Sequence, residues 1–172
     1  MKAVLISIHP KWVHKILDGK KTVEVRKTVP KIETPFKCYI YMTSGGREWR
    51  DPFSTAVVPP SGVGEMYCGA KRVVAEFICD RISTIAYTID GFADVVDCDT
   101  SCLTPKDFIE YGKGKPLYGW DISDLVIYEK PKALRDFRYY NCSVYWENGY
   151  PMPTHEIKRP PQSWCYVEKN DL

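Results

Sequence analysis

Hydrophobic and polar positions along the chain follow two different periods, which predict short strands joined by a few helices. Residues 3–8 form a continuous apolar run that is typical of a buried strand. Pro10 suits a first helical position, Gly19 suits a helix end, and four apolar residues between them have helical spacing: Trp12, Val13, Ile16 and Leu17. Residues 22–27 then alternate between apolar and polar positions, as in a strand with one buried face.

The same patterns continue through the rest of the chain. Further strands are predicted at residues 37–43, 71–83, 124–131 and 164–168. A helix is predicted after Thr104 as the N-cap, with Pro105 at its first position, Asp107 at the capping-box position and Gly112 as its stop. Pro131 is expected to end the strand that precedes it.

Residues 44–70 are rich in Gly, Ser and Pro and predict a long loop or insertion. The pattern elsewhere, short strands with two or three helices on their connections, favours an α+β fold. A mixed β-barrel or half-barrel with peripheral helices is the expected architecture. The 172 residues fit a single domain over residues 1–172.

Composition narrows the expected partners. The net charge of +2 is too small for strong non-specific binding to nucleic acid, although a local basic patch stays open. The 5 Trp and 12 Tyr are suited either to core packing or to stacking on ligand rings. No apolar run reaches membrane-spanning length and the first residues do not resemble a signal peptide, so the expected location is cytoplasmic and no membrane contact is expected.

The seven cysteines do not have the spacing of a structural zinc site, because no CxxC occurs and the Cys98–Cys102 pair has no second pair. Reduced thiols, no metal and no cofactor are therefore expected. The three histidines show no metal spacing and no local nucleophile signature: His9, His14 and His155.

Charged residues gather where the first helix turns into the next strand. Lys20 and Lys21 lie in the turn, and Glu24 and Arg26 share one strand face. Glu76 lies in a strand that is apolar on both sides, so its carboxylate needs a cationic partner, for which Arg26 or Lys21 are the candidates. The cluster is either an internal ion-pair network or the floor of a site, and both interpretations stand on this evidence.

Gly19, Lys21, Glu24 and Arg26 together fit the pattern G-x-K-x-x-E-x-R. This pattern after a strand and a helix resembles the ASCH domain, a branch of the PUA-like superfamily. Three later segments resemble longer ASCH proteins, including some from phages and prophages: VVAEF with Glu76, YGWDISDL and RPPQSWCYV. The resemblance covers most of the chain.

The resemblance implies a PUA-like β-barrel with a cleft beside the motif, and binding of RNA or a nucleotide-like small molecule. Some small ASCH proteins are amidohydrolases on acetylated cytidine that are thought to use a Lys, a Thr and a Glu. In this resemblance Lys21 matches the lysine and Glu76 the glutamate, but Glu24 stands at the threonine position. Ribonuclease activity has also been proposed for ASCH proteins, so a hydrolase is the alternative to a binding domain.

The candidate site residues follow from the motif and its surroundings. In a binding site, Lys21 and Arg26 would contact phosphate or a base carbonyl, and Glu24 would accept hydrogen bonds from a base amino group. Glu76 would be the fourth ligand-binding residue of the cluster and would hold the cations in position. In an enzyme, Lys21, Glu24 and Glu76 would be the catalytic residues. The other ligand-binding candidates, including aromatic residues that serve equally well in a core, are Tyr118, Trp120, Ser163 and Trp164.

Loop residues extend these alternatives. Arg47, Trp49 and Arg50 combine charge with an aromatic ring, as a loop facing nucleic acid would, and four loop cations would extend the patch: Lys113, Lys115, Lys158 and Arg159. A third hypothesis is a protein-interaction module that uses the loop at residues 44–70, for a protein partner that the sequence does not identify.

Overall fold

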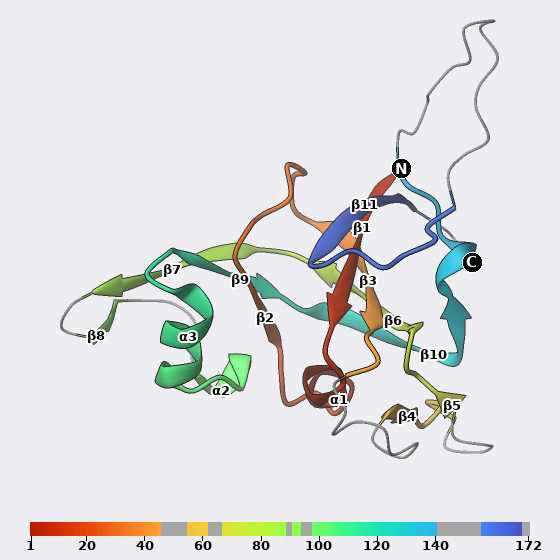
Figure 1. Ribbon diagram of the computed structural model, residues 1–172, viewed down its shortest axis with the longest axis horizontal. Helices are drawn as coiled ribbons and strands as arrows, with labels where there is room; N and C mark the ends of the chain where they lie inside the picture. The colour runs from red at the N-terminus through yellow and green to blue at the C-terminus, as the bar shows by residue number, and fades with distance from the viewer. Residues whose placement is uncertain (46–54, 62–66, 89–90, 94–97, 141–155, 170–172) are drawn as a thin grey trace, which may run out of the picture. The chain divides into compact units, whose positions relative to one another are not determined.

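The computed structural model describes residues 1–45, 55–61, 67–88, 91–93, 98–140 and 156–169. Three α-helices, one short 3-10 helix and eleven strands are formed by these residues. The strands are β1 (Lys2–Ile8), β2 (Val23–Arg26), β3 (Phe36–Met42), β4 (Ala56–Val57), β5 (Tyr67–Cys68), β6 (Arg72–Cys79), β7 (Ile82–Thr88), β8 (Gly91–Ala93), β9 (Leu117–Asp121), β10 (Ser123–Ala133) and β11 (Trp164–Glu168). The helices are α1 (Pro10–Leu17), α2 (Cys98–Ser101), α3 (Pro105–Gly112) and η3 (Leu134–Asp136). Figure 1 labels the strands and the three α-helices, and the predicted α+β class is confirmed.

Residue contacts divide the chain into two compact units, each built from discontinuous segments. Unit 1 consists of Met1–Pro10, Lys37–Glu76 and Val126–Leu172, and unit 2 consists of Lys11–Phe36 and Phe77–Leu125. A single domain over residues 1–172 stays a prediction.

Unit 1 contains most of a five-stranded sheet with the strand order β10-β6-β3-β1-β11. β1 is parallel to β3, with Ile6 opposite Ile40, and antiparallel to β11, with Leu5 opposite Cys165. Its core cluster consists of Ala3, Leu5, Tyr39, Tyr41, Val73, Tyr128, Phe137, Ile157 and Val167. The continuous apolar run of β1 thus reflects burial on both faces, since six of its seven residues are buried.

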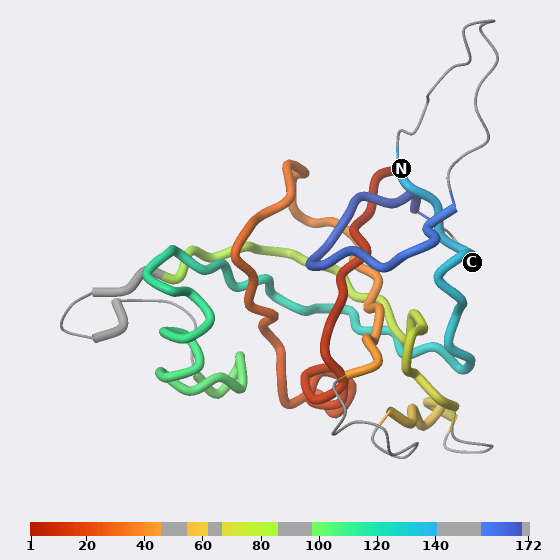
Figure 2. The backbone as a smooth tube through the Cα atoms, in the orientation of Figure 1, coloured from red at the N-terminus to blue at the C-terminus, as the bar shows by residue number. Residues whose placement is uncertain are grey.

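Unit 2 contains the four-stranded sheet with the order β2-β9-β7-β8. β9 pairs antiparallel with both β2 and β7, so its residues link the motif strand to the rest of the sheet. Val25, Ile85, Phe108 and Leu117 form a core cluster beneath it. Figure 2 shows α2 and α3 following one another in a continuous green coil.

The capping box predicted for α3 is confirmed. The Thr104 hydroxyl accepts a hydrogen bond from the Asp107 backbone N–H at 3.2 Å, and the Asp107 carboxylate accepts one from the Thr104 N–H at 2.8 Å. The helix ends differently from the prediction: Gly112 is still helical, and Lys113 is the left-handed C-cap with φ of 52°.

Two other boundaries differ from the sequence-based expectations. The segment 71–83 is two strands, because the chain turns at Asp80 and Arg81, where the Arg81 guanidinium binds Asp121 at 2.8 Å. β10 continues past Pro131 to Ala133. This is compatible with the missing N–H of proline because β10 is at the edge of its sheet.

Parts of the predicted connections also form strands. The loop predicted at 44–70 contains the short antiparallel pair β4 and β5, with Val57 opposite Tyr67.

The left-handed C-cap of α3 yields a stability prediction. We expect Lys113→Gly to raise the free energy of unfolding by about 0.5–1 kcal/mol, because glycine adopts this φ without the steric cost that a side chain incurs. Urea unfolding measures the change. Lys115→Gly is the matched control: Lys115 does not have a positive φ, so there glycine should not stabilise the chain. Equal effects at both positions would contradict this account of the cap.

Candidate functional site

The turn after α1 places Lys21 at the start of the site. Gly19 adopts a φ of 70°, which glycine tolerates, and its N–H donates to Ile16 O at 2.9 Å. The N–H groups of Lys20 and Lys21 both donate to Lys15 O at 2.9 Å, which closes the helix end. β2 begins two residues later, so the motif is held between a capped helix and a paired strand.

Lys21 is buried, with 2% of its side chain exposed. Its ammonium donates to the carbonyl oxygens of Val23 at 2.8 Å and Ser101 at 2.6 Å, and its Nζ lies 3.4 Å from Glu24 Oε2. Two backbone carbonyl acceptors and one ion-paired carboxylate therefore surround the ammonium group. Burial lowers the pKa of Lys21, and the nearby Glu24 carboxylate partly opposes this shift.

Glu24 lies between two cations on a strand whose four residues are all buried. Its Oε1 accepts from Arg26 Nη2 at 3.0 Å, whereas its Oε2 has the ion pair with Lys21 but no hydrogen bond. Arg26 also forms a hydrogen bond with Tyr111, and this bond opposes the rise in the Tyr111 pKa that burial causes. The carboxylate therefore keeps one oxygen with unused capacity to accept a hydrogen bond.

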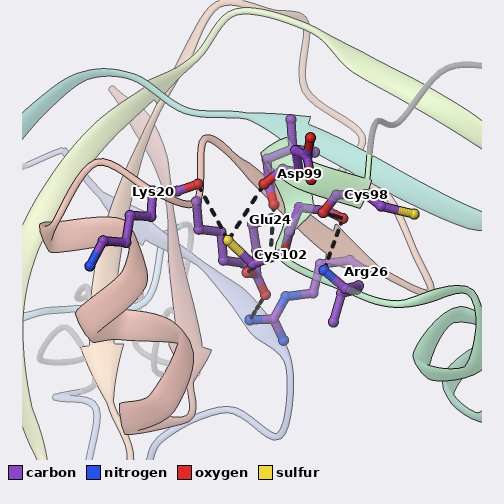
Figure 3. Close-up of polar contacts among 10 residues, drawn as sticks. Lys20, Glu24, Arg26, Cys98, Asp99 and Cys102 are labelled. Atoms are coloured by element: carbon purple, nitrogen blue, oxygen red, sulfur yellow. Dashed lines mark hydrogen bonds and ion pairs between the residues drawn. The ribbon is translucent and has the colours of Figure 1, made fainter.

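The segment around α2 forms hydrogen bonds with the first residues of the motif. Thr22 N–H donates to Thr100 O at 2.9 Å, next to the bond from Lys21 to Ser101. Cys102 Sγ donates to the backbone oxygens of Lys20 at 3.3 Å and Asp99 at 3.5 Å, as Figure 3 shows. Residues about 80 positions apart along the chain, Lys21 and Ser101, thus complete one site.

Lys21, Glu24 and Arg26 therefore come together as an internal ion-pair network of unit 2. Sequence reasoning missed Ser101, Cys102 and Tyr111 in this network. Ser101 contributes a backbone carbonyl, which has no sequence signature, and residues 86–103 showed no clear period. The helix with Tyr111 was predicted, but the contact of its side chain with the motif depends on the tertiary fold.

Glu76 lies in unit 1 and has different partners from those expected. Its Oε1 accepts from Lys37 Nζ and its Oε2 accepts from the Tyr128 hydroxyl, both at 2.6 Å. The expectation that Arg26 or Lys21 would pair with Glu76 is wrong, because β6 lies between β3 and β10 and those strands provide its partners. Burial alone would raise the pKa of Glu76, but its hydrogen bonds from Lys37 and Tyr128 hold it below the usual value.

The aromatic candidates differ in exposure. Tyr118 is half-buried on β9, directly opposite Arg26. Trp120 is fully buried, with its ring edge-to-face against Phe36 at 5.9 Å between centroids, which favours the core alternative for this residue. In this arrangement its ring is not available for stacking on a ligand.

Ser163 and Trp164 are half-buried residues of unit 1 at the start of the terminal strand. Ser163 O accepts from Ser7 N–H at 2.9 Å. Trp164 contacts Tyr166 edge-to-face at 5.3 Å, and Lys2 Nζ lies 3.6 Å from the Tyr166 ring centroid. A cation and two aromatic rings therefore gather at this edge strand.

The other candidates are placed only in part. Four loop cations are exposed: Lys113, Lys115, Lys158 and Arg159. Arg47, Trp49, Arg50 and His155 lie outside the described residues.

With this geometry in place, comparisons with known proteins identify the family. The sequence-family model of the ASCH domain matches residues 6–137 of this chain. The chain belongs to the ASCH family. No curated protein matches the chain.

Solved ASCH structures share the fold. An ASCH protein from Zymomonas mobilis superposes with a TM-score of 0.51 at 18% identity, over 97% of this chain and 88% of that one. A tyrosine-to-phenylalanine variant of that protein gives 0.50 at 16% identity, over 98% and 92% of the two chains. A serine-to-alanine variant gives 0.50 at 16% identity, over 97% and 89%.

Two further observations concern the described residues of this ASCH chain. None of their helices is long and apolar enough to cross a membrane. No group of three or more His, Cys, Asp or Glu side chains among them is arranged to hold a metal ion.

The buried network of this ASCH chain predicts a large cost for neutralising Glu24. Glu24→Gln preserves the shape but leaves Lys21 and Arg26 buried without a counter-charge, so we expect the free energy of unfolding to fall by about 3–5 kcal/mol. Urea unfolding at neutral pH measures it. Asp18→Asn is the control, because its ion pair with Lys20 is exposed and its loss should change the value by about 0.5 kcal/mol or less. Similar losses in both variants would contradict the assignment.

The lowered pKa of Glu76 predicts an acid-dependent loss of stability. Its folded-state pKa lies below the ordinary value of a glutamate, so its contribution to stability is full above that ordinary value and is lost as the pH falls through the folded-state pKa. We expect the difference in unfolding free energy between the wild type and Glu76→Gln to shrink as the pH falls below about 4.5. A difference that grows on acidification would mean a raised pKa and would contradict the assigned hydrogen bonds.

Proposed function

We propose that this ASCH chain binds RNA or a nucleotide-like ligand at the G-x-K-x-x-E-x-R motif. The ASCH family has a PUA-like fold of the RNA-binding type, which supports this class of ligand. We include in the proposal that the chain is of the longer type found in some phages and prophages, on the resemblance of its YGWDISDL and RPPQSWCYV segments.

The observation that carries the proposal is the state of the Glu24 carboxylate. Its side chain is 7% exposed, and Oε2 accepts no hydrogen bond although it is buried. Buried polar atoms without a hydrogen bond are rare in proteins and often belong to functional sites. An exocyclic amino group of cytosine or adenine is a donor suited to such an oxygen.

The geometry changes the roles that we assign to the cations. Lys21 and Arg26 already have protein partners, so in the proposed site they hold Glu24 ionised and oriented rather than contact phosphate themselves. The exposed Lys27 is better suited to phosphate, and its Nζ lies 4.6 Å from the ring centroid of Tyr111, which binds Arg26. Tyr118, opposite Arg26, is the proposed stacking residue beside the motif.

A base-preference experiment tests this site. We expect a cytidine oligonucleotide to bind about ten-fold or more tightly than the matching uridine oligonucleotide. Cytosine places an amino donor where uracil places a carbonyl oxygen, which a buried carboxylate repels. Fluorescence titration of labelled single-stranded RNA measures both affinities. Binding of uridine as tight as cytidine, or no RNA binding at low salt, would contradict the proposal.

The phosphate role of Lys27 has its own control. Lys27→Gln should weaken RNA binding and reduce the slope of log affinity against log salt by about 0.7, the value for one contact to a single strand. Lys31→Gln, four residues further along and also exposed, should leave the slope unchanged. Equal changes in both variants would indicate a general charge effect instead of a contact.

A hydrolase is the second candidate, and the lowered pKa of Lys21 is the observation that favours it. A lysine with a lowered pKa is closer to the neutral form that a general base requires. Incubation with N4-acetylcytidine and with an RNA pool, followed by product detection, tests this activity. Multiple turnovers by wild type that fall by about 10²–10⁴-fold in Lys21→Ala, under conditions where the variant is folded, would replace the binding proposal.

A further inference from the structure

A second group of charged side chains lies in unit 1, on three neighbouring strands of the five-stranded sheet. Lys37 is on β3, Glu76 is on β6, and Tyr128 and Lys132 are on β10. Glu76 is central, since it binds Lys37 through one oxygen and Tyr128 through the other. Lys132 Nζ lies over the Tyr128 ring, 3.8 Å from its centroid.

Lys37 and Lys132 give the group two positive charges and Glu76 gives it one negative charge, and the nearby carboxylate of Asp136 also acts on Lys132. Two ammonium groups face one carboxylate, and both oxygens of that carboxylate are engaged by Lys37 and Tyr128. Lys132 is half-buried, and its ammonium group contacts the aromatic ring of Tyr128. Burial and the nearby Lys37 lower its pKa, while Glu76 and Asp136 oppose the shift.

The group is also reachable from solvent. The side chains of Lys37 and Glu76 are 18% and 16% exposed, in contrast to 2% for Lys21 in the motif. In the part of the chain that the structure describes, Lys132 forms no direct ion pair with a carboxylate. A partly buried cation of this kind gains more from an added anion than a fully exposed cation does, because water screens it less.

We propose that Lys37 and Lys132 form a binding site for a phosphate group. In this site Lys132 provides the main contact and Lys37 a second charge. Glu76 is a positioning residue: it repels an anion, but its oxygens are covered by Lys37 Nζ and the Tyr128 hydroxyl. The phosphate belongs either to a free small molecule or to a nucleic acid. The inference does not depend on the proposed function of the motif.

The first experiment uses inorganic phosphate and the full chain. Phosphate is titrated while the amide and lysine side-chain NMR signals are followed, in wild type, Lys132→Gln and Lys132→Arg. We expect wild type to bind, Lys132→Gln to bind about ten-fold more weakly, and Lys132→Arg to retain binding because it keeps the charge.

Lys130→Gln is the matched control, since Lys130 is exposed and lies two residues before Lys132 on the same strand. It should change phosphate affinity by less than about two-fold. No binding by wild type, an unchanged affinity in Lys132→Gln, or an equal loss in Lys130→Gln would each overturn the proposal. Urea midpoints of all variants establish that they are folded.

A second comparison identifies the source of the phosphate. A short RNA with a 5′-phosphate and the same RNA without it are titrated into wild type and Lys132→Gln. A preference for the phosphorylated RNA that disappears in Lys132→Gln indicates a terminal phosphate. Equal binding of both RNAs that weakens in Lys132→Gln indicates backbone phosphates. Binding of inorganic phosphate with no effect of Lys132→Gln on either RNA indicates a small-molecule ligand.

Discussion

The constraint on which unit 2 depends is the neutralisation of a buried carboxylate. Glu24 lies on a strand with both faces buried, where an unpaired charge would be very unfavourable. Lys21 and Arg26 approach it from the turn and from the same strand, and each is held by further hydrogen bonds. The spacing of the G-x-K-x-x-E-x-R motif thus has a physical reason. Gly19 permits the turn that brings Lys21 beside Glu24, and the strand period places Arg26 on the same face.

This network explains why the segment around α2 belongs to the site. The buried ammonium of Lys21 donates a hydrogen bond to Val23 O and forms an ion pair with Glu24. Ser101 O is its second hydrogen-bond acceptor, and the bond from Thr22 to Thr100 and the thiol of Cys102 hold the segment of Ser101 in place. Cys102 has a φ of 54°, an unfavourable conformation for a residue with a side chain. Such strain persists only where the surrounding contacts over-determine it.

The sequence predicted the parts of this arrangement that depend on local patterns. The helix before Gly19, the strand of Glu24, and the capping box of Thr104 and Asp107 all follow from residues close together in the chain. The partner of Glu76 could not be predicted in the same way. Any cation on a strand next to β6 could neutralise the Glu76 carboxylate. Lys37 is the partner because β3 lies next to β6, and this strand order cannot be deduced from the local pattern of apolar and polar residues. Similarly, a tryptophan such as Trp120 is a residue type suited to stacking on a base. Its burial against Phe36 depends on how β9 packs within unit 2, which the local sequence does not determine.

The two carboxylates show how the same electrostatic requirement leads to different chemistry. Glu76 is partly exposed, each of its oxygens already accepts a hydrogen bond, and Lys37 and Lys132 lie around it. Glu24 is almost fully buried, and one of its oxygens is paired by charge alone. In the two proposed sites, a ligand that donates a hydrogen bond therefore interacts best with Glu24, whereas an anionic group interacts best with Lys37 and Lys132.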